Sequence, residues 1–191
     1  MNTIPLTFEQ HIPAYTIVGG EKTETKSSEK FFSVFILGRP DSIISDSTFE
    51  NILSFNFKSV LAIFQNTKNI EGLVEKFPNI KFIKTLEPVT TGEMINICAS
   101  ECESEFFIVL WSDTIISSQG FINSMLKNIL SEKNICTVPS LITDRNETLP
   151  NQMVPILQSH LFSVQKMPCF KDNTLTIYPF DFIGIYNRKK L

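Results

Sequence analysis

Short apolar runs alternate with amphipathic segments over most of the chain. The apolar runs predict five β-strands, at residues 32–37, 59–64, 79–84, 106–111 and 135–138. The segments between them carry apolar residues at helical spacing and predict four helices, at residues 46–55, 70–77, 91–102 and 119–131. Repeated strand–helix–strand units build parallel sheets with helices on both faces. The pattern therefore predicts an α/β fold, a three-layer α/β/α domain with a mainly parallel central sheet.

The pattern is weaker at both ends of the chain. Residues 1–30 contain two prolines and end in a polar stretch, so we interpret them as an N-terminal extension and a linker. Residues 31–191 form the predicted domain. After Pro139 we expect a loop at 144–155, a short helix at 156–165 and two strands, at 174–178 and 182–186.

Composition narrows the class of protein. Of 191 residues, 42% are hydrophobic and 19% charged, which is typical of a globular domain. The 17 basic and 20 acidic residues give a net charge of −3, so no basic field favours nucleic acid as a partner. The four cysteines form no CxxC pair and indicate buried thiols in a reducing compartment. We expect a cytoplasmic protein without a signal peptide, and leave peripheral association with a membrane open.

The fourth predicted strand ends abruptly in Ser112, Asp113 and Thr114. Ligands of open α/β sheets bind beyond the carboxyl ends of such strands. Asp113 therefore stands where a carboxylate can hold a metal ion and, through it, a phosphate. An ordinary turn, in which Asp and Ser are common, is the alternative interpretation. Neither a GxxxxGK[ST] loop nor a GxGxxG loop is present to bind a phosphate instead.

Several short segments occur in an order found in one enzyme family. A strand at Ser33-Val34-Phe35-Ile36 is followed by Arg39-Pro40-Asp41, then by Gly92 and Asn96, and then by Leu110-Trp111-Ser112-Asp113-Thr114. This order resembles the inverting glycosyltransferases of family 2, which have the GT-A fold. The last segment falls where that family carries its Asp-X-Asp metal motif. The resemblance covers about residues 31–140.

The resemblance implies transfer of a sugar from a nucleotide-sugar donor, a UDP- or GDP-sugar, with a divalent cation (Mn²⁺ or Mg²⁺) as cofactor. It gives Asp113 the metal or ribose contact, Asp41 the uracil contact, and Arg39 a place near the pyrophosphate or the base. Asn66 stands in a pair of amides that replaces the family's acidic pair, and amides can still hydrogen-bond a base or ribose. The acceptor, whether a glycan, a lipid-linked molecule or a protein, stays open.

The chain also departs from the family pattern. Trp111 stands at the first acidic position of the metal motif, and the family's acceptor region after the last predicted strand is missing from this sequence. No catalytic base is assigned, although Asp181 and Glu147 are loose candidates. These departures keep a second hypothesis open: a degenerate or truncated, non-catalytic binding or assembly module. A nucleotidylyltransferase is disfavoured because Gly38-Arg39-Pro40 is too short for its glycine-rich signature.

Overall fold

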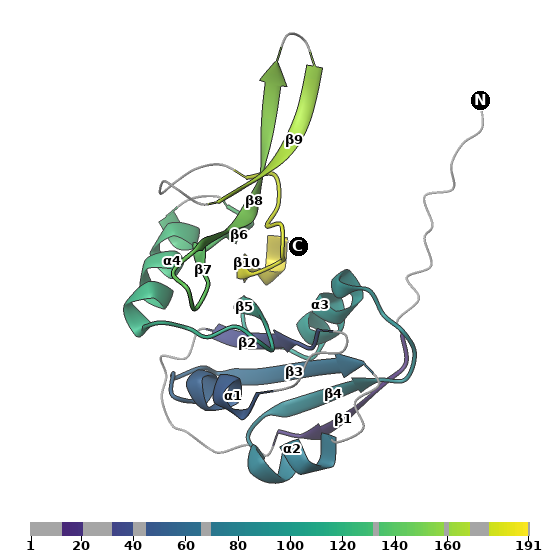
Figure 1. Cartoon of the computed structure of the whole chain (residues 1–191). Helices are drawn as coiled ribbons and strands as arrows, with labels where there is room; N and C mark the ends of the chain where they lie inside the picture. The colour runs from purple at the N-terminus through teal and green to yellow at the C-terminus, as the bar shows by residue number, and fades with distance from the viewer. Residues whose placement is uncertain are drawn as a thin grey trace, which may run out of the picture.

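A computed structural model describes residues 13–20, 32–39, 45–65, 70–131, 134–158, 161–168 and 176–190. Its main body is a seven-stranded sheet in the order β1-β4-β3-β2-β5-β10-β6 (Figure 1). The strands of this sheet are β1 (Tyr15–Gly19), β2 (Phe32–Leu37), β3 (Ser59–Gln65), β4 (Lys81–Thr85), β5 (Phe106–Trp111), β6 (Cys136–Thr137) and β10 (Gly184–Asn187). The helices are α1 (Asp46–Leu53), α2 (Ile70–Lys76), α3 (Thr91–Ser100) and α4 (Gln119–Ser131), with a short 3₁₀-helix at Arg188–Lys190.

The sheet is parallel at its centre. Strands β4, β3, β2 and β5 pair in parallel, whereas β1 and β10 join their neighbours antiparallel. All six residues of β2 and all six of β5 are buried, as expected for strands that helices cover on both faces. The predicted fold class, a mainly parallel α/β sheet, is confirmed.

Aromatic and aliphatic side chains hold the layers together. Phe49 of α1 packs against Phe64 and Phe82 on one face of the sheet and against Phe77, which follows α2. The connections through α1 and α2 run from β2 outward to β4, but the connection through α3 runs back to β5. Because such crossovers are right-handed, α3 covers the opposite face. The chain order thus reverses between β2 and β5.

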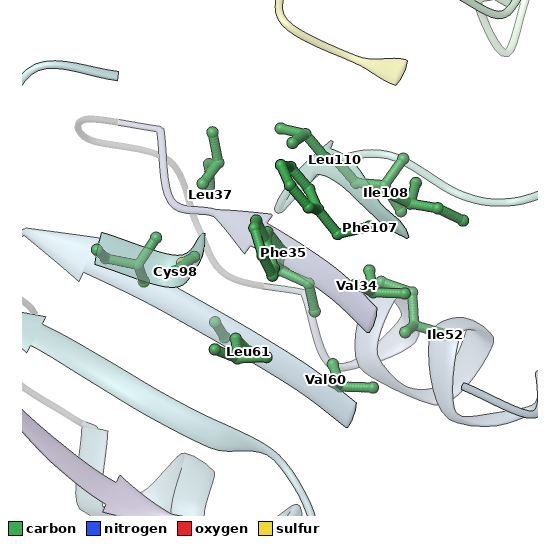
Figure 2. Close-up of a cluster of buried hydrophobic side chains, with 14 of the residues drawn as sticks. Val34, Phe35, Leu37, Ile52, Val60, Leu61, Cys98, Phe107, Ile108 and Leu110 are labelled. Carbon is green, nitrogen blue, oxygen red and sulfur yellow. The ribbon is translucent and has the colours of Figure 1, made fainter. Parts of the chain in front are cut away.

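The core between β2 and β5 is drawn in Figure 2. Phe35 and Phe107 stack with ring centroids 4.2 Å apart, and both are fully buried. Cys98 of α3 is also fully buried. This close packing fixes the relative position of the two strands from which the candidate site extends.

A second, smaller sheet follows α4 in sequence. It consists of β7 (Leu141–Ile142), β8 (Thr148–Gln158) and β9 (Leu161–Pro168), and its long hairpin projects away from the main body (Figure 1). The helix predicted at 156–165 and most of the loop predicted at 144–155 are therefore wrong. Cross-strand pairing between β8 and β9 overrides the local spacing of apolar residues in this segment.

The predictions for the two ends of the chain are confirmed in part. The strand predicted at 182–186 is β10, displaced to Gly184–Asn187, and residues 176–178 of the strand predicted at 174–178 form no strand. Sequence reasoning did not predict β1, which pairs with β4. Most of the predicted linker lies outside the described residues, and the division into 1–30 and 31–191 stays a prediction. None of the helices in the described ranges is long and apolar enough to cross a membrane.

Candidate functional site

The candidate site lies where the carboxyl ends of β2 and β5 meet. Leu37 and Trp111 are register partners at the ends of the two strands, and the Ser112 N–H donates to the Leu37 carbonyl at 2.9 Å. Residues that follow the two strands therefore emerge at one edge of the sheet. This edge is also the point at which the chain order reverses, where open α/β sheets bind their ligands.

Arg39 and Asp113, two residues predicted for the donor site, are in direct contact. Arg39 Nε donates to Asp113 Oδ2 at 3.0 Å, and Arg39 Nη2 donates to Asp181 Oδ2 at 2.7 Å. The guanidinium carbon lies 4.3 Å from the centre of the Trp111 ring, within the range of a cation–π contact. We call these four residues the Arg39 cluster: Arg39, Trp111, Asp113 and Asp181.

Asp181 is held in place by its backbone and its neighbours. The Trp111 indole N–H donates to the Asp181 carbonyl at 2.9 Å, and the Tyr186 hydroxyl donates to the Phe182 carbonyl at 2.6 Å. Phe182 has a positive φ of 60°, which lets the chain turn sharply before β10. Trp111 therefore stabilises the cluster in two ways: its ring packs over Arg39, and its N–H holds the turn that contains Asp181.

Helix α1 fixes the loop after β5. The Thr48 hydroxyl donates to the Ser112 carbonyl at 2.9 Å. The Asn51 side chain bonds both backbone groups of Ile116, accepting from its N–H at 2.8 Å and donating to its carbonyl at 3.1 Å. Asp113 lies between these two anchored positions, so its carboxylate is presented from a supported loop.

The charges of the cluster are partly shielded from water. The side chains of Arg39 and Asp181 are about one-third exposed, at 35% and 30%, and that of Asp113 is 54% exposed. Partial burial lowers the pKa of Arg39, but the hydrogen bond and charge of Asp181, followed by those of Asp113, outweigh this and raise the pKa overall. Two carboxylates around one guanidinium leave the cluster with a formal charge of −1, a setting that can accept a further cation.

The other predicted residues have different outcomes. Asp41 and Asn66 lie outside the described residues, so their predicted contacts stay predictions. Glu147 lies in the turn between β7 and β8, where its N–H bonds the Thr143 hydroxyl. Gln65 uses its side-chain amide to bond the Val89 backbone, donating at 2.6 Å and accepting at 3.3 Å. This residue therefore fixes the segment before α3.

The local sequence pattern offers little reason to place Asp181 in the cluster. It is separated from Arg39 by 142 residues, and it follows a segment whose strands were predicted imperfectly. Only the antiparallel pairing of β10 with β5 returns the chain to this edge. The apolar residues of β10 predict a strand, but this pattern does not specify the strand with which β10 pairs.

Among the described ranges, no group of three or more His, Cys, Asp or Glu side chains is arranged to hold a metal ion. Asp113 and Asp181 each bond a different nitrogen of the Arg39 guanidinium, which fills the space between their carboxylates. A cation at this edge would have to lie beside the guanidinium and would need further oxygen ligands from a bound molecule.

No protein-family model matches the chain, and no curated protein matches it. Among solved structures, TarS 1-349 of S. aureus is similar with a TM-score of 0.50 and 16% identity, over 82% of this chain and 47% of TarS.

Two further structures have lower scores. The bifunctional IspDF of Campylobacter jejuni has a TM-score of 0.49 and 18% identity, over 83% of this chain and 41% of its own. The mannosyltransferase PcManGT of Pyrobaculum calidifontis, solved in complex with GDP-Man and Mn²⁺, has a TM-score of 0.48 and 11% identity, over 60% of this chain and 36% of its own. The chain thus spans less than half the length of each of these three structures.

Identities this low establish a shared fold and nothing more. The likeness to TarS is thus a likeness of fold: a GT-A-like α/β fold with a mainly parallel central sheet.

Proposed function

We propose that the edge formed by β2 and β5 binds a nucleotide-sugar, and that the chain is the donor-binding part of a glycosyltransferase. The observation that carries this proposal is the Arg39 cluster, in which a guanidinium is held between two carboxylates at the reversal point of the sheet. Arg39 would supply positive charge to the diphosphate, and Asp113 an oxygen for a metal ion or a ribose. Asp41 and Asn66 stay in the proposal as predicted contacts to the nucleotide.

A divalent cation fits the chemistry of this edge. Mg²⁺ and Mn²⁺ take oxygen ligands and commonly combine one or two carboxylates with phosphate oxygens of the substrate. The Asp113 carboxylate would meet this requirement once a diphosphate adds its own oxygens. Asp113 is more exposed than Asp181, which bonds Arg39 Nη2, and is the proposed ligand. When bound, the cation would neutralise charge on the nucleoside diphosphate and so make it a better leaving group.

The finer parts of the proposal follow the family resemblance. They are an inverting, family-2-like reaction, a UDP- or GDP-sugar as donor, a glycan, lipid-linked or protein acceptor, and a cytoplasmic location. No catalytic base is proposed. Asp181 bonds Arg39 through its side chain and Trp111 through its backbone, so its assigned task is to position Arg39.

Calorimetric titration of the whole chain tests the proposal. UDP, GDP and their sugars would be titrated with and without Mn²⁺ or Mg²⁺, and binding is expected for at least one nucleotide. Arg39→Gln and Asp113→Asn should each weaken this binding by about tenfold or more, since charge-assisted hydrogen bonds contribute roughly 1.5–3 kcal/mol.

Lys58→Gln is the matched control. Lys58 pairs with Glu103 at 3.9 Å, and the two residues precede β3 and β5, at the opposite, amino edge of the parallel strands. This variant also removes one positive charge but should leave nucleotide binding unchanged. Absence of binding by all the nucleotides, or equal losses in all three variants, would contradict the proposal.

One observation favours the second candidate function, a non-catalytic binding module on the same fold. Trp111 occupies the first acidic position of the expected metal motif, is buried, and uses its ring and its N–H within the protein. A module of this kind would bind the nucleotide but would show neither sugar transfer nor hydrolysis of the donor. Metal-dependent release of UDP or GDP from a bound nucleotide-sugar would exclude this alternative.

A further inference from the structure

Phe182 has a backbone conformation that phenylalanine rarely adopts. Its φ of 60° lies in the left-handed region, in which the side chain of an L-residue crowds its own backbone. The only other non-glycine residue with a positive φ in the described part of the chain is Asn146, whose short polar side chain tolerates this region. Glycine at position 182 would relieve the strain, so the local backbone does not favour phenylalanine.

Hydrogen bonds on both sides hold the turn that contains Phe182. Its N–H donates to the Pro179 carbonyl at 3.4 Å, and its carbonyl accepts from the Tyr186 hydroxyl at 2.6 Å. The carbonyl of the preceding Asp181 accepts from the Trp111 indole N–H at 2.9 Å. The surrounding contacts therefore impose the strained conformation, a situation that is common in sites that bind ligands.

The Phe182 side chain is 37% exposed, although its turn brings Asp181 into contact with Arg39. Among the residues that the structure describes, none places an aromatic ring or a cationic group on the Phe182 ring. Phe35 and Phe107, by contrast, stack on each other in the core. A partly exposed, unstacked ring beside a charged cluster can pack against the apolar face of a ligand.

The order of strands along this edge indicates which part of a nucleotide-sugar would reach Phe182. The sheet runs β3-β2-β5-β10, so the ends of β3 and β2 lie on one side of β5 and the turn before β10 lies on the other. The predicted contacts to the nucleotide, Asn66 and Asp41, follow β3 and β2 in sequence, and Arg39 and Asp113 are proposed for the diphosphate and its cation. A nucleotide-sugar that extends along the edge in this order has its sugar beside β10.

We propose that Phe182 is a platform for the sugar ring of the nucleotide-sugar. This inference rests on the proposed function and concerns a part of the donor for which that function names no residue. A pyranose ring presents C–H groups on its faces and hydroxyl groups around its rim. The C–H face can pack on the aromatic ring, while the hydroxyl groups can donate to the neighbouring Asp181, whose carboxylate has about four lone-pair sites.

The other parts of the donor fit this position less well. A diphosphate needs N–H donors or a cation, and the Phe182 side chain supplies neither. A nucleobase can also stack on an aromatic ring, but its predicted contacts follow β3 and β2. Since neighbouring strands are about 4.8 Å apart, β10 lies about 10 Å from β2. The sugar is therefore the part of the donor that we assign to Phe182.

Calorimetric titration of the whole chain with paired ligands tests the proposal. Each UDP- or GDP-sugar that binds the wild-type chain is compared with the same nucleotide without its sugar. Phe182→Leu keeps an apolar side chain but removes the flat ring. It should weaken binding of the nucleotide-sugar by about three- to tenfold and leave binding of the nucleotide unchanged. Phe182→Tyr keeps the ring and should retain the affinity for both ligands.

Phe162→Leu is the matched control. Phe162 is also exposed, at 68%, but it lies on the β8–β9 hairpin, which projects away from the main body (Figure 1). The control should change neither affinity. If Phe182→Leu weakens both ligands equally or weakens neither, or if the nucleotide binds and none of its sugars does, the sugar contact is overturned and the proposed function remains. If no nucleotide binds, the proposed function is overturned, and this inference with it.

The strain at Phe182 is tested separately by urea unfolding of Phe182→Gly and Phe182→Ala. Both variants lose the ring, but only glycine adopts the left-handed conformation without strain. Phe182→Gly should therefore unfold at a higher urea concentration than Phe182→Ala. An equal or lower midpoint for the glycine variant would mean that the backbone does not disfavour a side chain here, which would overturn the structural basis of the proposal.

Discussion

Gly38 determines, at the scale of a single residue, how the chain leaves β2 for the Arg39 cluster. Its N–H donates to the Ile63 carbonyl at 2.8 Å, which holds the backbone against β3. A Cβ at this position would lie 2.2 Å from Cδ1 and 2.8 Å from Cε1 of the Phe64 ring, and 3.2 Å from the Ile63 carbonyl oxygen. The close approach of backbone and ring therefore requires glycine, and the position of Arg39 depends on it.

Gly38→Ala should destabilise the protein by about 1–3 kcal/mol, because the Phe64 ring or the backbone must shift in a packed core. Gly92→Ala is the control. Gly92 lies in the first turn of α3, where a Cβ would find only the Thr90 hydroxyl at 4.0 Å, so alanine should stabilise the helix by roughly 0.5–1 kcal/mol. Urea unfolding of both variants measures the two changes. A loss below about 0.5 kcal/mol for Gly38→Ala would mean that Phe64 moves freely.

The sequence predicts individual residues of the site only where they directly follow a predicted strand. Arg39 and Asp113 each follow an apolar run, and parallel strands bring the residues after such runs to one edge. Asp181 does not follow a predicted strand, and its position depends on the turn at Phe182 and on the pairing of β10 with β5. Trp111 stands where the family resemblance predicts a metal ligand, and in the structure its ring and N–H organise the cluster.

At the scale of elements, α1 supports the site as well as covering the sheet. The Asn51 side chain supplies hydrogen-bond partners for the backbone N–H and carbonyl of Ile116, which lies in a loop 65 residues away in sequence. Helix position and loop position are thus coupled by one side chain. Phe49 and Ile52, both fully buried, hold the helix itself on the sheet.

Asn51→Ala should lower the free energy of unfolding by about 1–3 kcal/mol, because two part-buried hydrogen bonds are lost. It should also weaken nucleotide binding, since the loop that carries Asp113 loses an anchor. Glu50→Ala changes the exposed neighbouring residue of the same helix and serves as the control. Thermal unfolding and nucleotide titration are the measurements. A variant with reduced stability but unchanged affinity would separate the support of the loop from the binding site.

The elements themselves were predicted unevenly, for a physical reason. The helix at Gln119–Ser131 was predicted at its observed bounds, since thirteen residues with helical spacing repeat the signal several times. The segment of β8 and β9 was predicted as a loop and a helix. Its apolar residues fit more than one period, and contacts between the two strands decide the outcome. Strand β1 was missed because four of its five residues are exposed and only pairing with β4 organises it.

At the scale of the whole molecule, one buried thiol, that of Cys98, makes the stability of the fold depend on pH. Cys98 lies on α3 and is fully buried. Burial raises the pKa of its thiol far above the ordinary range, and the nearby Cys102 and Glu101 add to this, while Lys81 acts in the opposite direction. The folded chain therefore keeps this thiol protonated under conditions in which the unfolded chain releases the proton.

The sign of the effect follows from the two pKa values. The stabilisation is fully present below the unfolded pKa of about 8.5, and it is lost as the pH rises above that value towards the higher folded pKa. Each pH unit in this range costs up to about 1.4 kcal/mol for one thiol. Between pH 8 and pH 10 the wild-type chain should thus lose about 2 kcal/mol more stability than Cys98→Ala, which has no thiol to titrate at this position.

Urea unfolding of both proteins at pH 8, 9 and 10 measures this difference directly. The smaller side chain of Cys98→Ala lowers stability by a pH-independent amount, so only the slopes of stability against pH are compared. All other titrating groups are shared by the two proteins and cancel in the comparison. Parallel slopes would mean that the folded core lets the Cys98 thiol ionise, either through water reaching α3 or through opening of the layer that α3 forms over β2 and β3.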